Sequence, residues 1–301
     1  MPLALPLRAL RLLVALVVAL VGHAVQAEIV VTDAGGTVVR LAAPAQRIVS
    51  LAPYITELVY AAGAGDRLVG NVEFGQHPPQ AKSIPKVGGY ERFDLEAILA
   101  LKADLVLGWE SGNPQAMISR MRALGLTVHL SQPDRIEDVA GELELIGKLA
   151  GSEAAAAAAA TAFRERHAQL ARRYSQRPSV DVFYQVWKQP LMTVNGKQII
   201  SDVIRLCGGR NVFAQLPALA PTVSVEGVIA ADPEVIIASG MDDARPEWLD
   251  DWKRWRKMKA VARGNLFFVP PDLIQRHTPR ILDGAEKLCI HLETARGKRG
   301  K

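Results

Sequence analysis

Short runs of β-branched and aliphatic residues alternate with helical segments over most of the chain after Arg47. Residues 47–51, 67–70 and 105–109 are apolar enough to form buried strands, and the stretches between them carry apolar residues at helical spacing. An alternation of this kind is typical of a parallel sheet that is covered by helices. The pattern therefore predicts an α/β fold.

The stretch from residue 152 to about residue 174 has no strand signal. Seven consecutive alanines at 154–160 give it a high helix propensity, and Phe163, Leu170 and Tyr174 continue an apolar stripe at helical spacing. A helix of about 22 residues would be about 33 Å long. We expect this helix to hold the parts of the protein on either side of it at a fixed separation.

Three segments of the first half recur in the same order in the second half. The pairs are 56–63 with 201–208, 95–107 with 225–237, and 128–134 with 267–272. A single echo could reflect the general pattern of a strand followed by a helix, but three in order indicate two similar α/β units. The predicted organisation is an N-terminal lobe over 28–151, an interlobe helix over 152–177, a C-terminal lobe over 178–293 and a flexible tail over 294–301.

Residues 1–27 have the features of a secretory signal peptide. Arg8 and Arg11 precede the apolar run 12–21, and small residues lead up to Ala27. An uncleaved membrane anchor is the alternative, but a run of about ten apolar residues is shorter than the ~20 that span a bilayer. We expect cleavage after Ala27 and release into a periplasm.

The composition of the 301-residue chain excludes several classes of protein. With 49% hydrophobic and 22% charged residues, it is typical of a globular protein and not of a disordered or fibrous one. A net charge of +5 is too small to indicate a nucleic-acid partner. The sequence has no serine-hydrolase elbow, phosphate-binding loop or zinc-protease motif. We expect a monomer without catalytic residues, resident cofactor or metal.

The sequence contains two cysteines, Cys207 and Cys289. In an oxidising compartment an even pair is a candidate disulfide, and two buried free thiols are the alternative. A bridge would close a loop of about 80 residues and stabilise the fold by at most ~4–5 kcal/mol. Neither cysteine belongs to a CxxC motif, which argues against a catalytic or metal-binding role.

Residues that follow the predicted strands are rich in aromatic side chains. In α/β sheets ligands bind beyond the carboxyl ends of the strands, so these residues are candidates for a binding site. They are Tyr54, Phe74, Tyr90 and Trp109 in the N-terminal half, and Trp187, Leu219, Leu273, Ile274 and Arg276 in the C-terminal half. If these two groups of residues face each other across a cleft, they suit a bulky, largely apolar ring compound with polar edges. We expect some of these rings to pack beneath their own loops instead.

A further group of aromatic residues lies in the C-terminal half. Trp248, Trp252 and Trp255 stand at helical spacing with basic residues between them. Such a stripe is most often one face of a helix that packs on its sheet. We expect it to be structural.

Several segments of the chain together carry a family resemblance. They are 47–53, 56–58, 78–79, 94–96, 101–106 and 207–213. In these segments the chain resembles the helical-backbone substrate-binding proteins of metal-chelate ABC importers, and in particular the periplasmic cobalamin-binding proteins. The resemblance covers about 47–292. It implies a class III periplasmic binding protein: two Rossmann-like lobes with parallel sheets, bridged by one long rigid α-helix, with a corrinoid between the lobes and a disulfide between Cys207 and Cys289.

The resemblance also implies roles for two glutamates. Glu96 and Glu226 match the glutamates, one on each lobe, that reach arginines of a dimeric membrane permease. Independently, they occupy equivalent places in the internal repeat, as contact with a two-fold symmetric partner requires. A solvated glutamate that the helix dipole favours in the first turn would give the same pattern.

For the cleft, the resemblance implies both similarities and departures. Trp109, Asp272 and Arg276 keep the residue types of the family and are predicted to contact the ligand. Tyr90 stands where the family has a tryptophan, and a second tryptophan is missing near Leu219. A tyrosine preserves a flat face, whereas the loss of a tryptophan removes a large contact area. We expect a planar ligand of tetrapyrrole size.

The predicted function is the capture of cobalamin or a related corrinoid in the periplasm and its delivery to an ABC permease dimer. Haem or a ferric siderophore is the alternative ligand. Haem would need an axial tyrosine or histidine, for which Tyr54, His77 and Tyr90 are candidates. A siderophore anion would need several arginines, and Arg92 and Arg276 are the few available. An exported α/β enzyme is the remote alternative.

Overall fold

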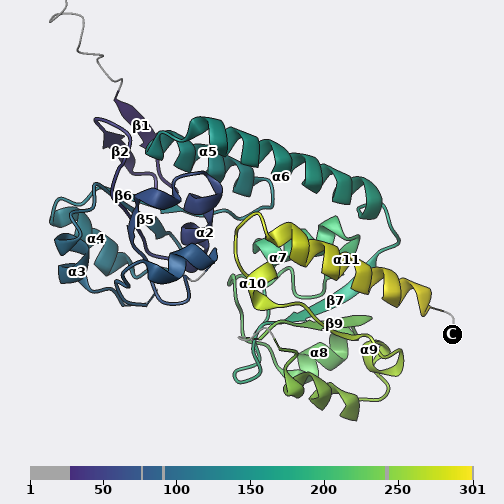
Figure 1. The fold of residues 1–301 in the computed structure, drawn as a ribbon. Coiled ribbons are helices and arrows are strands. Elements are labelled where there is room, and N and C mark those ends of the chain that lie inside the picture. The colour runs from purple at the N-terminus through teal and green to yellow at the C-terminus, as the bar shows by residue number, and fades with distance from the viewer. Residues whose placement is uncertain (1–27, 76, 90–91, 241–243, 300–301) are drawn as a thin grey trace, which may run out of the picture.

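The chain forms two lobes, each built on its own parallel sheet, and helix α6 (Glu153–Tyr174) runs between them (Figure 1). This arrangement confirms the predicted α/β fold of two lobes bridged by a long helix. The predicted signal segment 1–27 lies outside the described residues. The computed structural model describes residues 28–75, 77–89, 92–240 and 244–299.

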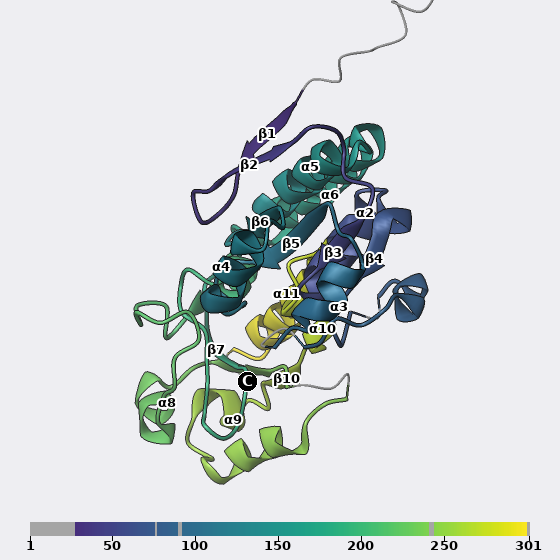
Figure 2. The same cartoon turned by 90° about the vertical axis from the view of Figure 1, so that its left-hand side faces the viewer.

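The sheet of the N-terminal lobe has the strand order β4-β3-β5-β6, and neighbouring strands are parallel. Its strands are β3 (Ile48–Ser50), β4 (Leu68–Gly70), β5 (Leu105–Trp109) and β6 (Val128–Ser131). An antiparallel hairpin of β1 (Ile29–Thr32) and β2 (Val38–Leu41) lies at the far end of this lobe (Figure 2). The helices are α2 (Pro53–Ala61), α3 (Leu95–Ala100), α4 (Gln115–Ala123) and α5 (Asp138–Ala150), with short 3₁₀ helices η1 (Gly65–Arg67) and η2 (Pro79–Ser83).

The sheet of the C-terminal lobe repeats this connectivity. Its parallel strands have the order β8-β7-β9-β10, which is the order of the first sheet when each is numbered along the chain. The strands are β7 (Val180–Gln185), β8 (Gly209–Asn211), β9 (Val235–Ala238) and β10 (Leu266–Phe268). The helices are α7 (Ile199–Leu206), α8 (Val225–Ala231), α9 (Lys259–Ala262), α10 (Pro271–Ile274) and α11 (Ile281–Gly297), with the 3₁₀ helix η3 (Glu247–Arg254). Over the described residues, no helix is both long and apolar enough to cross a membrane.

Equivalent helices of the two lobes begin with the same kind of cap. The side chain of Asp94 accepts a hydrogen bond from the backbone N–H of Ala97 at 3.0 Å at the start of α3. At the start of α8, Ser224 accepts from the backbone N–H of Gly227 at 3.0 Å. Each cap satisfies a backbone donor that the first turn of a helix leaves unpaired. The repeat in the sequence is therefore also a repeat in local structure.

Helix α6 is attached to both lobes. Near its start, Ala156 is fully buried, and a Cβ atom placed on Gly147 of α5 would lie 2.3 Å from the Cβ of Ala156. The two helices approach closely because both residues are small, so a bulkier side chain at either position would separate them. Farther along α6, Arg166 forms an ion pair with Asp283 of α11 at 2.6 Å.

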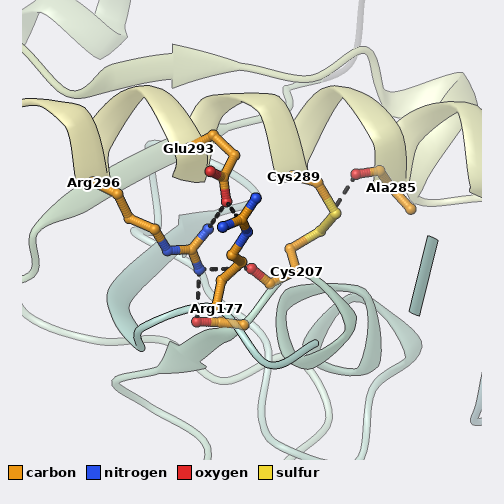
Figure 3. The surroundings of a disulfide bond; sticks show 7 residues. Arg177, Cys207, Ala285, Cys289, Glu293 and Arg296 are labelled. Atoms are coloured by element: carbon orange, nitrogen blue, oxygen red, sulfur yellow. Dashed lines mark hydrogen bonds and ion pairs between the residues drawn. A yellow bond between two sulfur atoms is a disulfide. The ribbon is translucent and has the colours of Figure 1, made fainter. Parts of the chain in front are cut away.

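A disulfide bond joins Cys207, which follows α7, to Cys289 of α11 (Figure 3). This bond confirms the predicted pairing. Both residues are fully buried and are 82 positions apart in the sequence. The bond therefore ties the last helix to the interior of the C-terminal lobe.

The end of the chain differs from the predicted flexible tail over 294–301. Helix α11 continues to Gly297, and Ala295 is buried. The guanidinium group of Arg296 donates hydrogen bonds to the carbonyl oxygens of Cys207 and Gly208 at 2.8 and 3.0 Å (Figure 3). A basic sequence with glycines is typical of a frayed end, but here a long arginine side chain reaches carbonyl groups that are distant in the sequence.

Candidate ligand-binding site

The two lobes meet at a cluster of aromatic rings. Trp109 ends β5, Tyr54 lies in the first turn of α2, and His277 follows α10 of the other lobe. The ring of Tyr54 lies edge-on to those of Trp109 and His277, with centroid distances of 5.8 and 5.1 Å, a geometry that the charge distribution of aromatic rings favours. Because Tyr54 is 3% exposed, it supports the contact between the lobes from beneath and offers no open face.

A polar chain lies behind the ring of Tyr54. Its hydroxyl donates to Ser131 Oγ at 3.1 Å, and Ser131 also hydrogen-bonds to Glu142 of α5. Burial raises the pKa of Glu142 to about 7, although the hydrogen bond from Ser131 acts in the opposite direction. Burial and the nearby Glu142 together raise the pKa of Tyr54 well above its ordinary value. The tyrosine is therefore neutral, and Glu142 titrates near neutral pH.

We expect Glu142→Gln to stabilise the protein above pH 7. The raised pKa means that the folded state holds a proton that the unfolded state releases above about pH 4.5, so this contribution to stability is full below pH 4.5 and is lost as the pH rises through 7. The variant should gain roughly 2–3 kcal/mol in the free energy of unfolding at pH 8 and nothing at pH 4. Urea denaturation at both pH values measures the difference.

Glu144, on the same helix, is the matched control. It is paired with Arg164 at 2.5 Å, and the hydrogen bond from that guanidinium group lowers the pKa of Glu144. Glu144→Gln should therefore give no gain at pH 8. A gain of similar size in both variants, or a gain for Glu142→Gln that does not depend on pH, would contradict the raised pKa.

Two ring nitrogens at the lobe contact lack a partner. Trp109 Nε1 and His277 Nδ1 are buried and make no hydrogen bond to any part of the chain that the structure describes. Burial lowers the pKa of His277 to about 4, so its ring is neutral at neutral pH. Buried polar atoms of proteins are normally hydrogen-bonded. Both atoms are enclosed, so a ligand that carries polar groups at its edge would reach them only after the contact between the lobes opens.

A buried carboxylate also joins the lobes. Glu57 of α2 is 4% exposed and forms ion pairs with Arg276 at 2.6 Å and Arg280 at 3.0 Å, both from the C-terminal lobe. Arg276 also pairs with Asp272 at 2.7 Å and donates to the carbonyl oxygen of Phe74 at 3.3 Å. The structure thus places Asp272 and Arg276, two predicted ligand contacts, in an ionic network between the lobes.

An acidic residue of the C-terminal lobe makes an equivalent contact with the N-terminal lobe. Asp202 of α7 occupies the place of Glu57 in the internal repeat, and its carboxylate accepts a hydrogen bond from the backbone N–H of Ile136 in the N-terminal lobe at 3.0 Å. Each acid lies on the first helix that follows the first strand of its sheet, and each reaches the segment after the last strand of the opposite lobe. The lobes therefore hold each other through two acids in pseudo-symmetric positions.

The other predicted contacts are distributed over exposed and buried positions. Phe74 and Trp187 are 62% and 38% exposed, Leu219 and Leu273 are half-buried, and Ile274 is buried in the core. Tyr90 lies outside the described residues. Beside the ionic network, a hollow of about 390 Å³ is lined from both lobes, by Glu57 and His77 on one side and Arg280 on the other. The exposed rings and this hollow leave room for a ligand near the lobe contact.

The two predicted docking glutamates lie at equivalent positions on the two lobes. Glu96 is exposed in the first turn of α3, and Glu226 is exposed in the first turn of α8. Helices α3 and α8 precede the corresponding strands β5 and β9. The geometry is thus compatible with a partner that presents the same surface twice.

Sequence reasoning missed three residues of the lobe contact: Glu57, His277 and Arg280. For Glu57 a signal was available, because it is an acid within an otherwise apolar helix and the repeat places another acid, Asp202, at the matching position. Nothing in the sequence near His277 or Arg280 indicates a contact with the other lobe. Among the described residues, no group of three or more His, Cys, Asp and Glu side chains could hold a metal ion.

Comparison with known proteins agrees with this architecture. Residues 48–273 match the periplasmic binding protein family, and the chain belongs to that family. Within it, the chain is 36% identical over 259 residues to the vitamin B12-binding protein of Vibrio parahaemolyticus, a match that covers 85% of this chain and 92% of the relative. It is 35% identical over 246 residues to the vitamin B12-binding protein of Photorhabdus laumondii, covering 82% and 87%.

Solved structures give the same result. The vitamin B12-binding protein BtuF of Vibrio cholerae superposes with a TM-score of 0.78 at 34% identity and covers 84% of this chain and 98% of that chain. A periplasmic heme-binding protein from Pseudomonas aeruginosa has a TM-score of 0.70 at 25% identity and covers 81% and 91%. The fold is therefore that of the class III periplasmic binding proteins.

Proposed function

We propose that this chain captures cobalamin or a related corrinoid in the periplasm, between its two lobes, and delivers it to an ABC permease dimer. The observation that carries the proposal is the likeness to the vitamin B12-binding protein of Vibrio cholerae, at 34% identity over 84% of this chain. A match of that extent includes both lobes and the contact between them. The role involves binding and release, and no bond is made or broken.

The proposed ligand contacts follow the strands of both sheets. A corrinoid has a large flat face and amide groups at its edge, so it suits exposed rings together with unpaired polar atoms. Phe74 and Trp187 supply the rings, and Trp109 Nε1, which is enclosed in this structure, supplies an unpaired donor once the lobe contact opens. The remaining proposed contacts are Tyr90, Leu219, Asp272, Leu273 and Arg276, with Tyr54 behind Trp109.

Arg276 has the chemistry to serve both the lobe contact and the ligand. Its guanidinium group carries five N–H donors, and the structural partners Glu57, Asp272 and Phe74 occupy only some of them. We expect the nitrogen that faces Asp272 to turn toward an amide oxygen of the ligand, while the nitrogen that faces Glu57 keeps its ion pair.

Calorimetric titration of the purified chain with cyanocobalamin, haemin and a ferric catecholate tests the proposal. We expect saturable one-to-one binding of cyanocobalamin. Saturable binding of haemin or the ferric catecholate alone would assign the site to that ligand and contradict the corrinoid proposal. Binding of none of the three would contradict the corrinoid proposal together with both alternative ligands.

Trp187→Ala is expected to weaken cyanocobalamin binding by about tenfold or more, because burying an aromatic side chain against a ligand stabilises the complex by roughly 1.5–3 kcal/mol. Trp255→Ala is the matched control, since both tryptophans are 38% exposed and Trp255, which directly follows η3, is not among the proposed ligand contacts. We expect no change in its affinity by calorimetry. Equal losses in the two variants would place the ligand elsewhere.

Glu96→Lys combined with Glu226→Lys is expected to reduce binding to the purified permease dimer by at least tenfold, while cyanocobalamin affinity is unchanged. Both carboxylates are exposed, so charge reversal replaces attraction to arginines by repulsion without disturbing the core. Glu137→Lys with Glu165→Lys alters the net charge equally at two other exposed sites and should leave permease binding intact. Loss of ligand affinity in the first variant would contradict a docking role.

A further inference from the structure

An exposed tryptophan stands within a basic segment at one end of the C-terminal lobe. Trp255 is 38% exposed, and Lys253, Arg254, Arg256 and Lys257 around it are all exposed. We call these five residues the basic aromatic patch. The patch covers the end of η3 and the residues before α9, and α9 lies in the part of the C-terminal lobe that is turned away from the N-terminal lobe (Figures 1 and 2).

The carboxylates near the patch do not neutralise it. Asp250 already pairs with Arg245 at 2.5 Å as well as with Lys253 at 3.1 Å. Asp251 likewise pairs with Lys188 at 2.8 Å, outside the patch, as well as with Arg254 at 3.9 Å, so two carboxylates face the four basic residues of the patch. Arg256 and Lys257 form no ion pair with any residue that the structure describes. The patch therefore presents a surplus of positive charge to solvent.

The ring of Trp255 borders an open hollow of about 600 Å³. Apolar side chains, Ile229 and Met258, contribute to the lining, and Arg254, Arg256 and Lys257 form its basic part. The one carboxylate in the lining, Asp232, is paired with Lys259 at 3.1 Å. The sequence predicts that the three tryptophans pack on the sheet as one apolar face. Trp252 does so and is 5% exposed, but such packing does not explain why Trp255 remains open to water. The open ring, the apolar lining and the basic side chains thus lie together at one exposed hollow.

We propose that the basic aromatic patch binds the anionic headgroups of a phospholipid bilayer. Tryptophan is enriched at the membrane–water interface, where an apolar ring with one polar atom is stable. Each basic residue near an anionic surface raises partitioning roughly fivefold. A single exposed aromatic ring offers no row of stacking platforms for a single-stranded nucleic acid. A ring and several cations together combine apolar burial with attraction to anionic lipids, the two contributions that set the strength of binding at a membrane surface.

The patch adjoins the second docking glutamate. A pocket of about 320 Å³ is lined by Glu226 together with Arg254 and Trp255 of the patch. A chain held on the bilayer by the patch thus keeps Glu226 close to the membrane surface, where a permease would be found. This last step rests on the proposed function, whereas binding to lipid does not.

Sedimentation with vesicles of phosphatidylcholine alone, and of phosphatidylcholine with about 30% phosphatidylglycerol, tests the proposal on the purified chain at low salt. We expect binding to the anionic vesicles and at least tenfold weaker binding to the neutral ones. Arg256→Glu with Lys257→Glu should reduce binding to the anionic vesicles by more than tenfold, and Trp255→Ala by about fivefold. The wild-type tryptophan fluorescence should shift to shorter wavelength on binding, and the shift should shrink in Trp255→Ala.

Arg172→Glu with Arg173→Glu is the matched control, because these adjacent arginines are exposed on α6 and the change in net charge is the same. We expect it to bind anionic vesicles like the wild type. Equal loss in the control, equal binding to neutral vesicles, or no binding by the wild type would overturn the proposal. Unchanged cyanocobalamin titration of all variants separates a failure here from a failure of the proposed function, and matching circular dichroism spectra show that the variants are folded.

Discussion

Replacement of both disulfide cysteines, Cys207→Ala with Cys289→Ala, is expected to lower the free energy of unfolding by about 4 kcal/mol. The bond spans 82 positions, and closing a loop of that length removes conformational entropy from the unfolded chain. The two alanines also leave a small void in a fully buried site. Urea denaturation of the variant and of the oxidised wild type measures the difference.

The reduced wild type provides the control. Because both cysteines are fully buried, dithiothreitol should leave the folded state intact and destabilise the protein only when the chain is unfolded and reduced. In reductant the wild type should then approach the variant, and the variant should not respond. A difference below about 1 kcal/mol between oxidised wild type and variant would show that the loop is already restricted in the unfolded chain.

Glu57→Gln is expected to lower the free energy of unfolding by about 3 kcal/mol, because it leaves two arginines of a largely buried contact with one carboxylate, that of Asp272, in place of two. Arg276 and Arg280 have side chains that are 16% and 26% exposed, so solvent screens them only in part. Equilibrium urea denaturation at neutral pH measures the loss.

Glu144→Gln is the comparison for that measurement. Glu144 also pairs with an arginine, Arg164, but both side chains are about half exposed, at 44% and 51%. An exposed ion pair contributes about 0.5 kcal/mol. Similar losses in the Glu57 and Glu144 variants would mean that the lobe contact is open to solvent, contrary to the structure.

Features that depend on neighbouring residues in the chain could be predicted from the sequence. The alanines at 154–160 and the apolar stripe after them locate α6 within a residue or two. The caps Asp94 and Ser224 recur because each serves the first turn of its own helix. The same periodic signals, compared between the halves, predict two lobes of equal connectivity.

The lobe contact could not be predicted in the same way, because it depends on pairs that are far apart in the sequence. Glu57 and Arg276 are separated by 219 positions, and no local pattern relates them. Tyr54 follows a strand, as an open binding residue would, but the ring of His277 from the other lobe covers it. A position after a strand places a residue at the carboxyl edge of its sheet. Whether its side chain is exposed depends on which residues of the opposite lobe pack against it.

The crossing of α5 and α6 has a mechanical consequence. Gly147 and Ala156 leave no space between these helices, and α6 extends well beyond that point before Arg166 meets α11. Any added volume at the crossing tilts α6 relative to α5 and so moves the C-terminal lobe, which is attached farther along α6. A tightly packed interior transmits a shift of about one ångström and does not absorb it. Such a shift at the crossing becomes larger at the far end of α6. The angle between the two lobes is therefore set by two of the smallest residues, a glycine and an alanine.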